Sequence, residues 1–284
     1  ATQSVFVTVT NLDDGEDFAV RLDGASNLDA AGGFVGRSLQ GAGDFNADGR
    51  EDILIGVQFM EANGLANGGK SFVLDGKWIT ETGQGLNPIV DLETITPPAG
   101  AQFEAVDGNQ FGMSLSRAGN IDGDGLDDQL IGARGLRSGL SGPPKYGYVE
   151  LIFGDYLSDI VAKTASSVNL GSYGPGDAVR LVDNKYGYFG GDVAGGHDVD
   201  GDGLDDVIIG APSNDPQGAT DAGEAYMVFG SYLHSLKSDG VISQDISALE
   251  PEQGLRLNHH SLASGEPGDF GFKVAMIPDL QGDD

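Results

Sequence analysis

The chain has 284 residues, 39% of them hydrophobic, so it can bury the core of one large domain or of two ordinary ones. Its 15 basic and 44 acidic residues give a net charge of −29, which argues against binding to nucleic acid or to an anionic membrane surface. Without cysteine, neither a disulfide nor a thiolate metal site can form, and no apolar run approaches the roughly 20 residues that span a bilayer.

Short strand-like segments bounded by glycine recur in a fixed order along the chain. An aromatic or apolar residue followed by glycine opens each unit, and an apolar position follows three residues later. An acidic loop then leads into an apolar run, and two further strands complete the unit. The opening pairs stand at 35–36, 111–112, 189–190 and 270–271, and the apolar runs at 53–56, 129–132 and 207–210. The third strands are predicted at 69–76, 147–154 and 223–230, and the fourth at 18–24, 101–108, 177–184 and 254–261.

These units repeat with spacings of 76, 78 and 81 residues between loop starts. No segment shows a clear helical periodicity, so the sequence predicts strands and turns throughout. Four-stranded units of this length indicate an all-β fold, a β-propeller of four-stranded antiparallel blades with an acidic loop between strands 1 and 2 of each blade. A solenoid is the alternative, although its repeats are usually shorter, about 20–45 residues.

We expect residues 1–284 to form a single, incomplete propeller. Because the last unit stops inside its acidic loop, the sequence favours a longer native chain, while a small ring closed by few further residues is the alternative. The expected parts are outer strands of a shared or preceding blade at 1–30, blades at 31–108, 109–185 and 186–262, and the start of a truncated blade at 263–284.

The third acidic loop offers oxygen ligands at alternate positions around one centre. Gly203, at position 6, permits the sharp turn that brings the later ligands round, and we expect Asp205, at position 8, to face outward. Ca²⁺ accepts 6–8 oxygens with flexible geometry, whereas Mg²⁺ requires a stricter octahedron, so Ca²⁺ is the expected ion. The predicted ligands, at positions 1, 3, 5, 7 (backbone carbonyl) and 9, are Asp198, Asp200, Asp202, Leu204 and Asp206.

Two further loops repeat this pattern with one amide each, which lowers their ligand charge and predicts weaker binding than in the third loop. The first offers Asp44, Asn46, Asp48, the Arg50 carbonyl and Asp52. The second offers Asn120, Asp122, Asp124, the Leu126 carbonyl and Asp128. A fourth set, Asp279, Gln281 and Asp283, lacks the glycine and is not counted as a site.

Two other interpretations, an EF-hand and a plain turn, explain these loops less well than a repeated calcium-binding loop does. An EF-hand needs a glutamate at position 12 and flanking helices, but position 12 is Gly56, Gly132 or Gly210 and the flanks are predicted strands. Asp, Asn and Gly are common in solvated turns, so a single loop would be weak evidence. Three copies in register within a larger repeat favour three calcium sites.

The motif as a whole resembles the FG-GAP repeat, the blade unit of the integrin α-subunit propeller and its bacterial relatives. The third unit matches throughout, from Phe189-Gly190 through the acidic loop to Gly210-Ala211-Pro212, while the first unit, with Val35-Gly36, departs most. The resemblance implies an extracellular or cell-surface propeller that binds calcium on the loops of one face. It does not by itself imply the function of an integrin.

No catalytic motif is present, and carboxylate pairs among 44 acidic residues discriminate nothing. The leading hypothesis is therefore a non-enzymatic adhesion or binding module whose rim loops recognise a protein or a glycan. A structural subunit, completed by self-assembly or by a further domain, is the second hypothesis. A polysaccharide-acting enzyme with a site in the central channel is the third. The long connections 57–68, 134–146 and 212–222 fit the first two hypotheses, because they can vary without disturbing the blades.

Overall fold

The computed structural model describes residues 4–9, 18–23, 38–65, 67–83, 89–135, 146–163, 167–185, 187–215, 222–258 and 269–277. Its strands are β1 (Ser4–Val9), β2 (Phe18–Asp23), β3 (Ser38–Gly43), β4 (Asp52–Val57), β5 (Lys70–Leu74), β6 (Ile89–Asp91), β7 (Gly100–Glu104), β8 (Phe111–Gly119), β9 (Asp128–Ala133), β10 (Tyr148–Ile152), β11 (Ser167–Asn169), β12 (Ala178–Val182), β13 (Val193–His197), β14 (Asp206–Ala211), β15 (Glu224–Val228), β16 (Ser243–Asp245) and β17 (Gly254–Asn258). The helices are α1 (Gly76–Gly83), α2 (Gly154–Lys163) and α3 (Gly230–Ser238), with a short 3-10 helix η1 (Leu92–Thr94).

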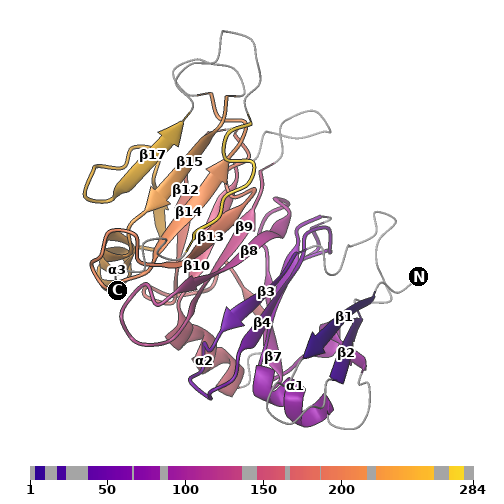
Figure 1. Cartoon of the computed structure of the whole chain (residues 1–284). Helices are drawn as coiled ribbons and strands as arrows, with labels where there is room; N and C mark the ends of the chain where they lie inside the picture. Colours follow the sequence, from indigo (N-terminus) through magenta and orange to yellow (C-terminus); the bar gives the residue numbers. More distant parts are fainter. Residues whose placement is uncertain are drawn as a thin grey trace.

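Four sheets follow one another in chain order and form an open arc (Figure 1). The sheet β1-β2-β6 lies at one end and the sheet β13-β14-β15-β17 at the other. Between them lie the sheets β11-β7-β5-β4-β3 and β16-β12-β10-β9-β8. The strand β8 contacts β3 on one side and β13 on the other, so the three sheets that contain these strands meet along their first strands. An all-β architecture of antiparallel units is therefore confirmed, and the described sheets do not close into a ring.

Within each unit the four predicted strands pair antiparallel in chain order. A three-residue strand from the following unit then extends the sheet in parallel, in every described sheet except that of β13, β14, β15 and β17. The strand β11 pairs with β7, β16 pairs with β12, and β6 pairs with β2. The four-stranded blade of the sequence prediction therefore gains an outer strand that its own repeat does not encode.

Three short helices contradict the expectation of strands and turns alone. Each begins at the glycine that ends a predicted third strand, namely Gly76, Gly154 or Gly230. The buried side chains of α2 are Leu157, Ile160 and Val161, and those of α3 are Leu233 and Leu236. Helices of 8 to 10 residues present only two or three such positions, too few for the pattern to stand out in the sequence.

Apolar side chains between neighbouring sheets form the core. One cluster joins Phe45 and Phe103 of the first full unit to Phe111 and Ile131 of the second. Another joins the second unit to the third around Phe189, Tyr226 and Ile209. A third packs α1, β6 and η1 against β4 and β5. Every residue of β9 and of β14 is buried because both faces of a second strand meet a neighbour, which explains the continuous apolar runs in the sequence.

Candidate cation site

The three acidic loops lie at equivalent places, between β3 and β4, β8 and β9, and β13 and β14. A register shift in each first strand, just before the loop, marks a β-bulge that redirects the chain. The predicted turn at position 6 is present, because Gly49, Gly125 and Gly203 adopt φ values of 84°, 89° and 91°. Position 4 also has positive φ, which Ala47 adopts at 55° without the freedom of glycine.

The first residue of each loop organises the turn through its side chain. The carboxylate of Asp44 accepts hydrogen bonds from the amides of Asp48 and Gly49, at 3.0 and 2.9 Å. The carboxylate of Asp198 accepts from Gly203 at 2.8 Å, and the amide oxygen of Asn120 accepts from Gly125 at 3.2 Å. An amide at position 1 therefore supports the same turn as a carboxylate.

The last residue of each loop is a buried carboxylate that holds two separate segments. Asp52, Asp128 and Asp206 are at most 1% exposed, and each accepts one amide from position 2 of its own loop. The other carboxylate oxygen accepts the first amide of the following helix, at 2.8–2.9 Å. Burial raises the pKa of Asp52 to about 7, and that of Asp128 well above its usual range. These groups resist ionisation unless a positive charge lies nearby.

In the third loop, carboxylate oxygens of Asp198, Asp200 and Asp206 all lie within 4.8 Å of one another. Burial and the neighbouring charges of Asp202 and Asp198 raise the pKa of Asp200. Asp202 lies outside this cluster, and its carboxylate accepts the amide of Leu204 at 2.9 Å. An all-oxygen set of converging carboxylates fits a hard divalent cation such as Ca²⁺.

The second loop gathers a different set of side chains. Oxygens of Asp122 and Asp124 lie within 4.8 Å of one another and of the Asp155 carboxylate, which belongs to the first turn of α2. The ammonium group of Lys237, from α3 of the following unit, forms ion pairs with Asp122 and, at 3.0 Å, with Asp155. The sequence pattern did not identify Asp155 or Lys237, because both lie outside the loop.

The first loop also has a carboxylate from outside. Asp75 precedes α1, and its carboxylate accepts a hydrogen bond from the Asn46 amide at 2.8 Å. An extra carboxylate therefore stands beside each of the two loops in which an amide replaces an aspartate. Asp75 and Asp155 each lie next to the glycine that begins a helix. Their place beside the loops could therefore be predicted only if the helices were predicted first. Lys237 counters the charge that Asp155 adds at the second loop, so the predicted charge deficit is offset in this way only at the first loop.

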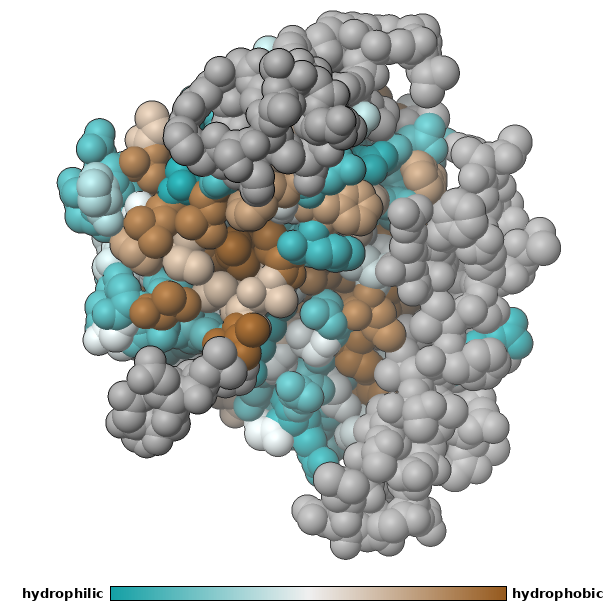
Figure 2. Space-filling model, turned by 45° about the horizontal axis from the view of Figure 1, so that its top comes forward, coloured by the Kyte–Doolittle hydropathy of each residue, from teal (hydrophilic) through white to brown (hydrophobic). Residues whose placement is uncertain are grey.

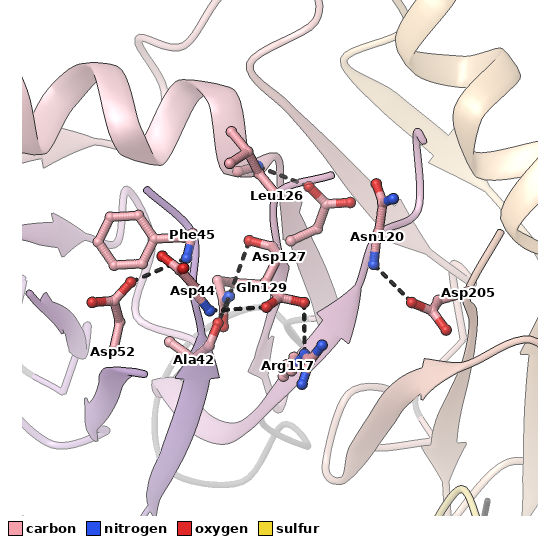
Figure 3. A network of polar contacts seen from close by, with 12 residues as sticks. Ala42, Asp44, Phe45, Asp52, Arg117, Asn120, Leu126, Asp127, Gln129 and Asp205 are labelled. Carbon is pink, nitrogen blue, oxygen red and sulfur yellow. Dashed lines mark hydrogen bonds and ion pairs between the residues drawn. The ribbon is translucent and has the colours of Figure 1, made fainter. Parts of the chain in front are cut away.

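The aspartate at position 8 bridges neighbouring units (Figure 3). Asp205 accepts the backbone amide of Asn120 at 2.8 Å, and Asp127 accepts that of Asp44 at 2.9 Å. The expectation that Asp205 faces outward is therefore wrong. A pattern within one repeat cannot show a contact that forms only between two repeats.

The remaining predicted residues are placed as follows. The amides of Arg50 and Leu126 donate to the position-5 carboxylates at 2.9 and 2.8 Å, as Leu204 does in the third loop. Ligation by the carbonyls of these three residues stays a prediction. The doubtful fourth set, Asp279, Gln281 and Asp283, lies outside the described residues.

A groove of about 870 Å³ runs along the first strands of the units, lined among others by Leu39, Leu115, Arg134, Val193 and Phe272. Figure 2 shows one face of the molecule on which apolar side chains gather between hydrophilic ones. No described helix is long and apolar enough to cross a membrane.

Comparison with known proteins gives one family and several relatives. Residues 189–227 match the family model of the FG-GAP repeat. The chain is 33% identical to integrin alpha pat-2 of Caenorhabditis briggsae over 183 residues, which is 63% of this chain and 13% of that protein. It is 26% identical to integrin alpha-PS2 of Drosophila melanogaster over 250 residues, 88% of this chain and 14% of that protein. The chain therefore spans only 13–14% of the length of these relatives.

Proposed function

Because residues 189–227 match the FG-GAP repeat and the chain is similar to integrin α subunits, we propose that it is a calcium-stabilised, non-enzymatic β-propeller module of the cell surface or extracellular space. Its role is adhesion or the binding of a protein or glycan ligand. The units at 31–108, 109–185 and 186–262 act as blades, and each acidic loop binds one Ca²⁺.

The carboxylate cluster of the third loop carries this proposal. Asp198, Asp200 and Asp206 converge within the segment that matches the FG-GAP model. Without a cation, three carboxylates so close together repel by about 1 kcal/mol or more per pair. In the proposed sites a bound Ca²⁺ offsets this repulsion and fastens the loop to the first two strands of its blade. The proposed ligands are those predicted from the sequence, with Asp75 and Asp155 adding charge at the first and second loops.

The test is calcium stoichiometry by native mass spectrometry, before and after chelation. We expect three ions per chain, and two in Asp200→Ala, which removes the ligand instead of replacing it with the amide found at this position in the first loop. Glu252→Ala removes the same charge from an exposed residue away from the loops and should retain all three. An unchanged count in Asp200→Ala would contradict the assignment of the third loop.

Ligand binding by the rim loops and the groove is the second part of the proposal. Screening the chain against immobilised glycans and extracellular proteins, with calcium and with chelator, tests it. Calcium-dependent, saturable binding by a monomer supports the binding module. A structural subunit remains the second candidate, because β17 is the last strand of its sheet among the described residues and has no fifth strand there. Calcium-dependent oligomers without ligand binding would favour that candidate.

A further inference from the structure

The cation loops of neighbouring units are joined by a direct hydrogen bond. The Asp127 carboxylate, at position 8 of the second loop, accepts the backbone amide of Asp44, the first residue of the first loop. Asp205, at position 8 of the third loop, accepts the corresponding amide of Asn120, and its own amide donates to the Asn120 carbonyl at 3.4 Å. The same contact thus occurs at both boundaries between full units (Figure 3).

The backbone around this contact is shaped to receive the carboxylate. A β-carbon on Gly43 would overlap Asp127, and one on Gly119 would overlap Asp205. Both glycines adopt positive φ, 66° and 82°, so a side chain there would be strained as well as blocked. The contact therefore depends on a glycine directly before the first residue of the receiving loop.

The residue that receives the contact is itself a proposed cation ligand. The amide of Asp44 is held by Asp127, while the side chain of Asp44 holds the turn of its own loop through Asp48 and Gly49. Asp127 is fixed in turn by the guanidinium of Arg117 at 2.6 Å, and Gln129 donates to the Ala42 carbonyl at 2.6 Å beside it.

From this arrangement we propose that Asp127 and Asp205 are positioning residues for the cation loop of the preceding unit, and that each strengthens cation binding in that loop. The first and second loops then each depend on an aspartate encoded about one repeat later, as well as on their own ligands. The inference rests on the proposed calcium sites.

Trp78, the only tryptophan, provides a probe of the first loop alone. It lies in the first turn of α1, its amide donates to Asp75 at 2.6 Å, and Gly76 of the same turn donates to Asp52. Terbium(III) bound in the first loop should emit when the indole is excited, whereas ions in the more distant loops should not.

The experiment compares Asp127→Ala with Asp205→Ala by terbium titration. Asp127→Ala should weaken the Trp78-sensitised site about tenfold, the size expected for loss of one charge-assisted hydrogen bond. Asp205→Ala, the same change one unit further along, should leave that site within about twofold. Arg117→Met removes the ion pair of Asp127 but leaves the amide contact, so it should have the smaller effect.

A purely structural role for Asp127 would give a different result. Melting temperatures measured in chelator report the structural loss alone, and Asp127→Ala should lower the melting temperature more in calcium than in chelator. An equal loss in both conditions, or an unchanged affinity of the first loop in a folded Asp127→Ala chain, would overturn the positioning role of Asp127. Absence of terbium emission and of calcium uptake in the unsubstituted chain would instead overturn the proposed sites themselves, and the positioning role with them.

Discussion

The carbonyl oxygen of Gly112 occupies the space that a β-carbon on Gly56 would need. Gly190 and Gly132 stand in the same relation at the next boundary, and Gly271 and Gly210 at the one after. In each pair, the glycine of the opening aromatic-glycine motif lies against the glycine that ends the apolar run of the second strand in the preceding unit. The two ends of the sequence motif therefore contact each other across a boundary between units.

Gly56→Ala should destabilise the chain by about 2–3 kcal/mol, because the methyl group must displace backbone rather than a side chain. Gly41→Ala is the matched control, since the nearest atom to its β-carbon would be a flexible side-chain oxygen of Glu51 at 3.6 Å. Urea unfolding of both variants in saturating calcium measures the difference. Equal stability of the two variants would show that the boundary adapts.

Lys237→Met should strengthen cation binding in the second loop, by about threefold to tenfold. The ammonium group pairs with Asp122 and Asp155, and it repels a divalent ion that uses the same carboxylates. Calcium titration calorimetry measures the change. Lys273→Met removes the same charge from an exposed residue paired with Asp192, and it should leave the affinity of the second loop unaltered.

Asp183 should make stability depend on pH below neutrality. Burial raises its pKa to about 6, while Asn214 donates to its carboxylate at 2.8 Å. Because the folded-state pKa lies above the unfolded value, the stabilisation is fully present below about pH 4 and is lost as pH rises through 6. The loss is about 3 kcal/mol at 1.36 kcal/mol per pH unit.

Asp183→Asn should remove this dependence. Urea unfolding of both chains at several pH values between 4 and 7, in saturating calcium, isolates the contribution of Asp183 as the difference between them. The lowered pKa of Glu224, which has Lys185 and Tyr226 as partners, acts in the opposite direction but is common to both chains. A constant difference across this pH range would contradict the prediction.

Glu150→Leu should cost about 3–5 kcal/mol, because it leaves a guanidinium group without its counter-charge. Glu150 is fully buried and pairs with Arg180 at 2.6 Å, while the hydroxyl of Tyr173 donates to it at 2.8 Å. In the double variant with Arg180→Met, much of the loss should be recovered. A double-mutant cycle by urea unfolding measures the coupling, and simple additivity would show that the two side chains act independently.

The sequence predicted the strands well because glycine boundaries and apolar runs are local signals. The four strands of each full unit appear where the repeat placed them, and the positive φ of Gly203 follows from its place in the loop. The resemblance to the FG-GAP repeat, based on Phe189-Gly190 and Gly210-Ala211-Pro212, is confirmed by the match at 189–227.

What the sequence did not predict depends on contacts between units or on very short elements. The strand β11 has only three residues, too few for an alternating pattern, and its partner lies in the preceding unit. Asp155 and Lys237 reach the second loop from two different helices, and Asp205 reaches it from the following loop. The spacing of residues within the loop motif does not predict these contacts.

The parallel fifth strand of a sheet is encoded in the following repeat, so the boundaries of the sequence repeat differ from those of the folded sheet. A fragment that ends at residue 108 would keep β7 but lose β11, and β7 would then present unpaired backbone groups at its edge. Duplication of a whole repeat within the array, by contrast, leaves every internal edge covered, because each new copy brings the strand that its predecessor needs. Duplication of whole repeats can therefore extend the array without exposing a sheet edge, whereas cleavage within the array exposes one.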